Sequence, residues 1–516
     1  MEKMLHTNRF LTLISDNCKL LSITTIIILI YYYYTKNFDY FKKRNVKYIK
    51  PVIFFGSNVL GFLALKSQAM VIKHYYDTFK DQAFGGIFEG RSPRYILCDP
   101  ELIKTISVSD GDHFIDRNSV QSNEAGYSSR SLLALKGEEW KAVRSLITPT
   151  FSSARLKNMF PLIQTCCNQL VDLIARHDKN DIELKAFTGH LTLEVTGVCA
   201  FGISTDILKD ENAEYYKLAA GNSYMSIPKR IFFFSILLLM PSIFKYIPIS
   251  IMDDETNRKL VKIIQNSKAE RRSGSSKRSD LLQLLVDASL QEKEELLKGG
   301  RPNKIYLDDD TIDAQALLFL QAGFGTTCTL LTYALFTLAL HTDIQDKLRA
   351  HILEVTKGKE LSYDRLVELE YLESILNETL RMYPPLVRID RCCSKPYTIP
   401  GTSLDLKVGD VVVIPVYGLH MDPKLYPEPE IFKPDRFMKN GKLDRLPDSF
   451  LAFGCGPRYC IGRRFSMLVA KAAMVTLLTN FKFTICPKTV YPLGISKTEV
   501  VTFLPEEGAW VRVEKI

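Results

Sequence analysis

The sequence lacks any pattern of paired cysteines. Its eleven cysteines are scattered, and no two of them form a Cys-x-x-Cys pair or repeat at a regular interval. Small secreted proteins that depend on disulfides show such spacing. This absence argues against a disulfide framework and favours a reducing compartment.

The chain also lacks a recognisable module for nucleic acids and a binding motif for flavin or nicotinamide. No stretch interleaves aromatic and basic residues as nucleic-acid modules do. The net charge of +9 is better suited to an anionic membrane surface or an acidic partner. With 46% hydrophobic and 24% charged residues over 516 positions, the composition is globular and sufficient for a large core.

The apolar run near the N-terminus is short. Residues 20–34 carry no charge and end in four tyrosines, which suits a membrane–water interface. The run is below the usual ~20 residues of a transmembrane helix, although residues 11–14 can extend it. Basic residues follow and predict a cytosolic location for the rest of the chain: Lys36, Lys42, Lys43, Arg44, Lys47 and Lys50. Because no Ala-x-Ala-like cleavage site is present, an uncleaved anchor is favoured over a cleaved signal peptide.

The most informative stretch, residues 452–463, is rich in glycine and contains one well-placed cysteine. Gly454 and Gly456 permit backbone conformations that a Cβ disfavours. The residues after Gly462 predict a helix start, so backbone N–H groups near Cys460 can point at its sulfur and favour the thiolate. A thiolate held in this way is a good axial ligand for haem iron. The alternative is a structural cysteine buried in a glycine-rich loop.

This stretch resembles the haem-binding signature Phe-x-x-Gly-x-Arg-x-Cys-x-Gly of the cytochrome P450 family. The matching residues are Phe453, Gly456, Arg458, Cys460 and Gly462. The resemblance implies haem b as cofactor, with Cys460 on the iron, Phe453 against the haem and Arg458 on a haem propionate. It also implies a mainly α fold with small β-sheets, built as one large catalytic domain.

Three further residues resemble those that contact haem propionates in this family. Trp140 and Arg144 are four positions apart and therefore share a helix face, although plain packing would give the same spacing. Residues 146–153 resemble the microsomal, xenobiotic-metabolising animal branch, including its insect members. Arg391 falls where the family has another propionate-binding arginine.

A long helix is predicted over residues 309–340, and it contains Ala-Gly-Phe-Gly-Thr-Thr at 322–327. Each glycine inside a helix costs about 1 kcal/mol relative to alanine. We expect Gly323 to let a ligand approach the backbone, and Thr326 to bond back to a carbonyl and open the helix locally. Thr326 matches the family threonine that assists proton delivery, whereas Gly325 stands where the family has an acid. This departure puts the proton route, and the coupling of electrons to product, in doubt.

A second helix ends at Pro384-Pro385 and carries Glu378 and Arg381 three positions apart, where they can pair. In the family, a second arginine locks such a pair, and Arg436 within Pro-Asp-Arg-Phe supplies it here. We interpret Glu378, Arg381 and Arg436 as a structural lock behind the cysteine loop. His420 is predicted to pack or cap rather than to bind a ligand.

Three other segments carry weaker expectations. The apolar run 231–240 predicts either a buried helix or a lipid-dipping cover over the substrate entrance. Residues 268–278 are charged and rich in Ser and Gly, which predicts a solvated loop. The tail around 500–513 predicts a hairpin.

Together, the motifs imply a membrane-anchored haem-thiolate monooxygenase that acts on O2 and a lipophilic small molecule, with no role for nucleic acid. We expect an anchor at 1–35, a basic linker at 36–56 and the catalytic domain at 57–516, in the endoplasmic reticulum membrane with the domain in the cytosol. Electrons would come from NADPH–cytochrome P450 reductase, with cytochrome b5 as a second candidate, docking near Lys141, Arg463 and Arg464. Two alternatives remain: a haem-thiolate isomerase or dehydratase without a reductase, and a non-catalytic haem-binding protein.

Overall fold

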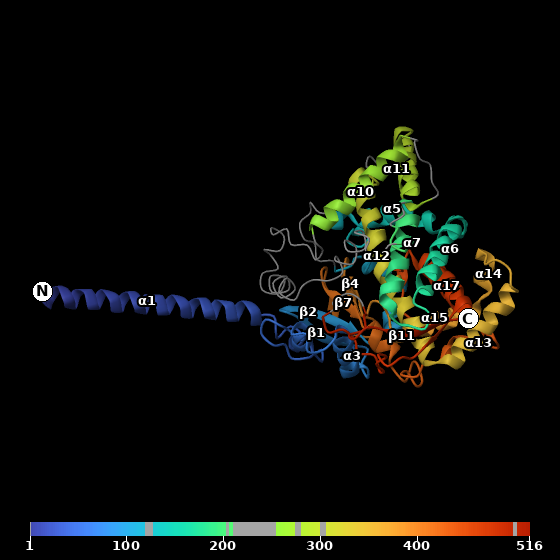
Figure 1. Cartoon of the computed structure of the whole chain (residues 1–516). Coiled ribbons are helices and arrows are strands. Elements are labelled where there is room, and N and C mark those ends of the chain that lie inside the picture. Colours follow the sequence, from blue (N-terminus) through green and yellow to red (C-terminus); the bar gives the residue numbers. More distant parts are fainter. Residues whose placement is uncertain are drawn as a thin grey trace.

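The computed structural model describes residues 2–118, 127–202, 206–209, 254–273, 280–299, 306–498 and 503–516. The apolar run 231–240 lies outside the described residues. The body of the molecule is mainly helical, and one long helix projects from it (Figure 1).

The fold combines many helices with small sheets, as predicted. The helices are α1 (Glu2–Thr35), α2 (Val59–Phe62), α3 (Gln68–Phe79), α4 (Pro100–Lys104), α5 (Gly137–Ile147), α6 (Ser153–Ala175), α7 (Leu184–Phe201), α10 (Asp254–Arg272), α11 (Leu281–Leu297), α12 (Asp309–Leu340), α13 (Thr342–Thr356), α14 (Tyr363–Glu368), α15 (Glu370–Met382), α16 (Val416–His420) and α17 (Arg463–Asn480). The strands are β1 (Phe84–Glu89), β2 (Ser92–Leu97), β3 (Asp181–Glu183), β4 (Ile389–Cys392), β5 (Tyr397–Thr398), β6 (Asp405–Leu406), β7 (Val411–Ile414), β8 (Met438–Lys439), β9 (Lys442–Leu443), β10 (Phe481–Thr484) and β11 (Trp510–Lys515).

The projecting helix is α1 (Figure 1). Its stretch Asn17–Thr35 is long and apolar enough to cross a membrane, and only 6% of that stretch is buried. An exposed apolar surface of this extent is unusual for a soluble monomer and marks an interaction site. The helix is therefore compatible with membrane anchoring.

The core is organised around α12, which the sequence predicts with the same bounds. Asp308 caps its N-terminus by accepting a hydrogen bond from the Thr311 backbone N–H at 2.8 Å. The helix packs against α7, α15 and α17. It is also long and apolar enough to cross a membrane, but 72% of its most apolar 18-residue stretch is buried, as expected of a core helix.

The two largest of the four sheets in the described residues flank the helices. One has the strand order β1-β2-β7-β4 and lies near the end of α1 (Figure 1). Its β2–β7 pair is parallel, and the other two pairs are antiparallel. The second has the order β10-β11-β3, so the described end of the tail pairs with β10 and β3. Most of the partner expected in a tail hairpin, residues 500–504, lies outside the described residues.

The prediction of a solvated loop over 268–278 is wrong for its first residues, because α10 continues to Arg272. Lys268 and Arg271 are buried. Their side chains lie 2.5 Å from an Asp313 oxygen and 2.7 Å from an Asp280 oxygen. Composition suggested solvent, but each buried cation has a carboxylate partner that offsets its desolvation.

Candidate active site

A cavity of about 260 Å³ lies between α5, α7, α12 and the segment 451–466. Much of its wall is apolar, including Leu132, Phe151, Phe319, Leu330, Ile389 and Val416. The cavity also collects predicted cofactor-binding and catalytic residues: Trp140, Arg144, Thr326, Phe453, Arg458 and Cys460. Of the predicted cofactor-binding residues, Arg391 does not line it. Segments far apart in the sequence thus meet at one site.

The loop that carries Cys460 is shaped by its glycines. Gly454 and Gly456 have φ values of +76° and +66°, a region that favours glycine. A Cβ on Gly456 would also lie 1.7 Å from the Ser107 carbonyl oxygen, so no larger residue fits. The Cys460 N–H donates to the Phe453 carbonyl at 2.9 Å and closes the loop. The local conformation predicted for this loop is confirmed.

Gly462 has a different role from the other loop glycines. Its φ is −87°, and a Cβ there would meet no protein atom within 4 Å. Neither backbone strain nor protein packing therefore requires glycine at this position. Because Gly462 lines the cavity two residues after Cys460, a side chain would extend into the space beside the sulfur.

The Cys460 sulfur is exposed on the cavity wall, although protein surrounds the site. Burial raises the pKa of its thiol. The Gly462 and Arg463 backbone N–H groups oppose this shift, as do the nearby Arg117 and Arg144 charges. A metal cation deprotonates a coordinating thiol outright. The N–H groups and arginines would thus stabilise a thiolate, but burial outweighs them, so a bound metal would be needed to form it.

Three arginines line the cavity: Arg117, Arg144 and Arg458. Burial, together with the nearby charge of Arg391, lowers the pKa of Arg117 to about 10. Burial and the charge of Arg117 lower that of Arg458 to about 9. Among the described residues, no carboxylate lines the same cavity. Asp116, which is outside the lining, lies 3.6 Å from Arg458 Nη2, whereas Arg117 and Arg144 have no ion pair within the described residues. Buried cations without anionic partners are costly, so the site calls for an anionic ligand.

These features fit haem b, which carries two carboxylate groups as propionates. The Nε of Arg117 is buried without a hydrogen-bond partner among the described residues, and a propionate would satisfy it. The Cys460 thiol provides a soft ligand for iron. The Gly462 position leaves space beside that sulfur. Charge, ligand type and shape all agree with this cofactor.

The other arginines differ in how many of their N–H groups already donate to protein carbonyls. Arg458 donates to the carbonyls of Ile115, Leu132 and Leu135 at 2.6, 3.0 and 2.7 Å, and its guanidinium lies 4.0 Å from the Trp140 ring centroid. Arg458 therefore mainly stabilises the structure around the cysteine loop.

Arg144 donates to the Tyr459 carbonyl at 2.9 Å, next to Cys460, and keeps other N–H groups for the cavity. Arg391 donates to the Cys455 carbonyl at 3.2 Å and to the Asp390 carbonyl at 2.9 Å. It supports the cysteine loop from behind the cavity wall. Its role as a propionate ligand stays a prediction.

Arg117 was not predicted from the sequence. It stands in a loop beside Asp116, without helical spacing to another functional residue. Its Nη2 donates to the Arg458 carbonyl at 3.4 Å, a contact over more than 300 positions of sequence. Because this tertiary contact defines its place, no local pattern marks it.

In α12, the hydroxyl of Thr326 donates to the Ala322 carbonyl at 2.6 Å, which is the predicted back-bond. A Cβ on Gly323 would lie 3.3 Å from Thr196 Oγ1, so this glycine also allows α7 to approach α12 closely. Within the part of the chain that the structure describes, a Cβ on Gly325 would meet no atom within 4 Å. The missing acid at 325 is therefore not imposed by packing.

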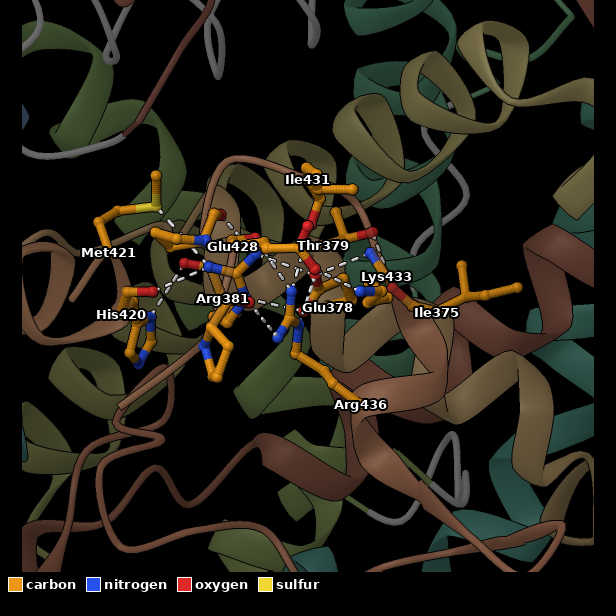
Figure 2. A network of polar contacts seen from close by, with 12 residues as sticks. Ile375, Glu378, Thr379, Arg381, His420, Met421, Glu428, Ile431, Lys433 and Arg436 are labelled. Carbon is orange, nitrogen blue, oxygen red and sulfur yellow. Dashed lines mark hydrogen bonds and ion pairs between the residues drawn. The ribbon is translucent and has the colours of Figure 1, made fainter. Parts of the chain in front are cut away.

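Glu378, Arg381 and Arg436 form a buried ionic network (Figure 2). Glu378 accepts hydrogen bonds from Arg381 Nε and Nη2 at 2.8 and 2.9 Å, and from Arg436 Nε at 2.9 Å. The Lys433 backbone N–H adds a further bond at 2.9 Å. Arg381 also donates to the carbonyls of His420 and Pro429 at 2.8 and 2.7 Å. The three predicted residues thus tie α15 to the segment 420–436.

His420 extends this network to the cysteine loop. Its Nε2 accepts the Leu451 backbone N–H at 2.9 Å, so the ring proton must be on Nδ1, which lies 3.1 Å from the Arg381 carbonyl oxygen. Burial and the charge of Arg381 lower the pKa of His420 to about 3 and keep it neutral. Leu451 is two residues before Phe453, so the lock and the loop are directly connected.

Comparisons with known proteins agree with this site. The family model described as Cytochrome P450 matches residues 50–510. Cytochrome P450 9e2 of Blattella germanica is 34% identical over 510 residues, covering 93% of this chain and 95% of the relative. Cytochrome P450 6j1 of the same organism is 34% identical, with 91% and 92% covered.

A mammalian relative shows the same extent of similarity. Cytochrome P450 3A41 of Mus musculus is 32% identical, with 95% of both chains covered. The resemblance to the animal branch is thereby confirmed, and the match covers the cavity, the lock and the cysteine loop. The chain belongs to the cytochrome P450 family of haem-thiolate monooxygenases.

Proposed function

We propose that this chain inserts one atom of O2 into a lipophilic small molecule, a xenobiotic or an endogenous lipid or hormone. The observation that carries this proposal is the Cys460 thiol on the wall of a largely apolar cavity whose charged lining residues are arginines. An apolar wall favours a ligand that gains free energy by leaving water. The lack of a carboxylate among the described lining residues argues against a cationic substrate.

The site residues take distinct roles. Haem, when bound, supplies the iron at which O2 reacts. Cys460 would ligate this iron, and Arg117, Arg144 and Trp140 would hold the propionates. Phe453 and Arg458 would support the haem from the loop side. Thr326 has its hydroxyl proton on the Ala322 carbonyl, so its oxygen is free to accept a hydrogen bond from a water that brings protons.

We place the electron donor, a separate NADPH–cytochrome P450 reductase with cytochrome b5 as a second candidate, on the basic surface near the cysteine loop. Arg464 is exposed there and has no ion pair among the described residues. Lys141 lies 3.2 Å from Glu138, and Arg463 lies 3.7 Å from Glu373, so both charges are partly neutralised. Arg464→Glu should therefore slow haem reduction most, in a salt-dependent way. Unchanged reduction rates would contradict this docking site.

We further propose an anchor at 1–35 in the endoplasmic reticulum membrane, a basic linker at 36–56 and a cytosolic catalytic domain at 57–516. The exposed apolar face of α1 and the basic residues after it support this arrangement. The linker is packed rather than free, because Phe41 is fully buried and the Gly86 N–H donates to the Lys47 carbonyl at 2.8 Å.

The decisive experiment compares two reactions of the reconstituted protein. A monooxygenase needs reductase, NADPH and O2 to convert a lipophilic substrate, whereas an isomerase or dehydratase rearranges an organic peroxide without them. We expect product only in the complete reductase system. Turnover of peroxide alone, with none in the complete system, would favour the isomerase, to which Gly325 gives some support. Tight ligand binding without product in either system would indicate a non-catalytic haem protein.

A further inference from the structure

A groove of about 1310 Å³ lies outside the active site, between three segments far apart in the sequence. The segments are residues 42–48, 82–84 and 402–407. The first follows α1 after a short turn, the second leads into β1, and the third includes β6. The groove is therefore a product of the tertiary fold and is not a feature of the linker alone.

The groove is strongly basic. Its lining includes Lys42, Lys43, Arg44, Lys47 and Lys407, against one carboxylate, Asp405. Asp405 accepts a hydrogen bond from the Thr398 hydroxyl at 2.7 Å. Lys43 pairs with Asp39 at 2.5 Å.

Three exposed lysines of this groove have no carboxylate partner of their own among the described residues. Lys42, Lys47 and Lys407 are exposed and take part in no ion pair within the described ranges. Lys47 Nζ makes only a long hydrogen bond, 3.5 Å, to the Thr78 carbonyl. These ammonium groups are therefore available to an external anion.

The backbone beneath these cations is fixed. Phe41, directly before the basic run, is fully buried and packs edge-on against Phe88 and Tyr95 at 5.2 Å. Arg44 lies over the Tyr40 ring at 3.7 Å. Since the cations stand on an ordered frame, an anion that binds between them loses less free energy in ordering the site.

The groove is also close to the end of the proposed anchor. α1 ends at Thr35. A series of turn hydrogen bonds follows it: the first runs from the Lys36 N–H to the Tyr32 carbonyl, and a later one runs from the Lys43 N–H to the Asp39 carbonyl. These bonds keep the segment compact. Basic clusters immediately cytosolic of a transmembrane helix attract anionic lipid headgroups, at about 1 kcal/mol per Lys or Arg. The groove thus lies where headgroups are the most abundant anions.

We propose that this groove binds the headgroup of an anionic phospholipid and thereby fixes how the domain sits on the membrane. The proposal rests on the membrane anchoring proposed above. The occupant follows from the unpaired cations, the fixed frame and the adjacency to α1. Lys407 is the critical residue, because only the fold brings it to the linker cations.

The test uses the full chain in phosphatidylcholine vesicles that contain a trace of spin-labelled phosphatidylserine or spin-labelled phosphatidylcholine. Electron paramagnetic resonance measures the fraction of each lipid that the protein immobilises. We expect a preference for phosphatidylserine that weakens with added salt. Lys407→Glu should reduce this preference at least about fivefold, the equivalent of one surface lysine, and Lys407→Gln should reduce it less.

A matched control is Lys359→Glu, which changes the same charge on an exposed residue just beyond the end of α13. Figure 1 shows α13 at the opposite end of the body from α1. It should leave the preference unchanged. Absence of any preference in the unaltered chain would overturn the proposal, as would equal effects of both charge reversals or no effect of Lys407→Glu. If Lys407→Glu slows reduction of the haem by the reductase but leaves the lipid preference unchanged, the groove binds a protein partner and the lipid proposal is wrong.

Two further measurements test membrane anchoring and haem binding separately from the groove proposal. Flotation of the vesicles reports whether α1 anchors the chain, and the haem spectrum in the same sample reports whether the active site is intact. A floated, haem-loaded protein without lipid preference therefore contradicts the groove proposal alone.

Discussion

Arg117, Arg144 and Arg458 bring positive charge to a cavity whose described lining residues include no carboxylate. The lowered pKa values of Arg117 and Arg458 reflect the cost of this arrangement. Haem propionates would reduce that cost, so we expect the arginines to contribute to cofactor affinity. Arg117 matters most in this respect, because its buried Nε has no described protein partner.

Replacing Arg117 by glutamine should therefore accelerate haem loss. A hydrogen bond to a charged group contributes about 1.5–3 kcal/mol, so we expect haem release to become roughly ten times faster. The measurement is haem transfer to an excess of an apo-haem acceptor protein. Arg445→Gln, at a side chain that is 86% exposed, is the control and should have no effect. Equal release rates for Arg117→Gln and the unaltered chain would show that Arg117 does not bind the cofactor.

Gly325 leads to a second prediction at this scale. The position has room for a side chain, and leaving glycine does not weaken a helix, so Gly325→Asp should fold. An acid beside Thr326 should supply protons faster and raise the ratio of product to NADPH consumed at least about twofold. Gly325→Asn, which adds similar volume but no proton source, should not. A ratio that falls or stays constant with aspartate would mean that protons already reach the site by another route.

At the residue scale, the sequence allowed prediction wherever function depends on a local motif. Cys460, Phe453 and Arg458 are ten or fewer positions apart, and Trp140 and Arg144 share one helix turn, so short motifs that resemble those of the family could point to them. Arg117 reaches the site only through a tertiary contact with Arg458, and no spacing could indicate it.

At the scale of elements, the lock connects α15, α16 and the loop that carries Cys460. Glu378 and Arg381 are fully buried, and the Glu378 carboxylate is satisfied by two arginines and one backbone N–H. Sequence spacing predicted the pairing of Glu378 with Arg381, and the resemblance to the family added Arg436. It could not predict the His420–Leu451 bond, because that contact joins segments 31 positions apart.

Breaking the lock should be costly. Glu378→Gln leaves Arg381 buried without its counter-charge, which is expected to destabilise the protein by about 3–5 kcal/mol. Thermal unfolding and the yield of haem-loaded protein measure this effect. Asp435→Asn removes a carboxylate that is 65% exposed and lies 3.4 Å from Lys347, so it should change stability by less than about 1 kcal/mol. Similar stability in both variants would exclude the lock as a structural element.

His420 should make stability depend on pH. Its pKa is lowered to about 3 from the ordinary value of 6.5, so folding favours the neutral ring. This contribution is fully present above about pH 6.5 and is lost as the pH falls toward 3, at roughly 1.4 kcal/mol per pH unit.

The corresponding measurement is the midpoint of thermal haem loss between pH 7 and pH 4.5, in the unaltered chain and in His420→Gln. The variant should be less stable at pH 7 and lose less stability on acidification. Parallel pH curves for the two proteins would contradict the proposed role of His420.

At the scale of the whole molecule, the chain combines an exposed apolar helix, a mainly helical body and a basic groove where the two meet. The resemblance to the family predicted the class of fold, and the sequence predicted the full extent of α12. The sheet that β11 forms with β3 and β10 could not be predicted from the sequence, because β3 and β11 lie far apart along the chain. The basic groove could not be predicted either, since Lys407 lies beside the linker cations only in the folded protein.

The most direct test of the central claim is the carbon monoxide difference spectrum of the reduced, detergent-extracted protein, measured beside Cys460→Ala. Thiolate ligation shifts the carbon monoxide band strongly to the red. Our account predicts this red-shifted band in the unaltered chain and its loss in the variant. A band typical of a neutral axial ligand in the unaltered chain, or a red-shifted band that persists in Cys460→Ala, would contradict the assignment of Cys460 as the haem ligand.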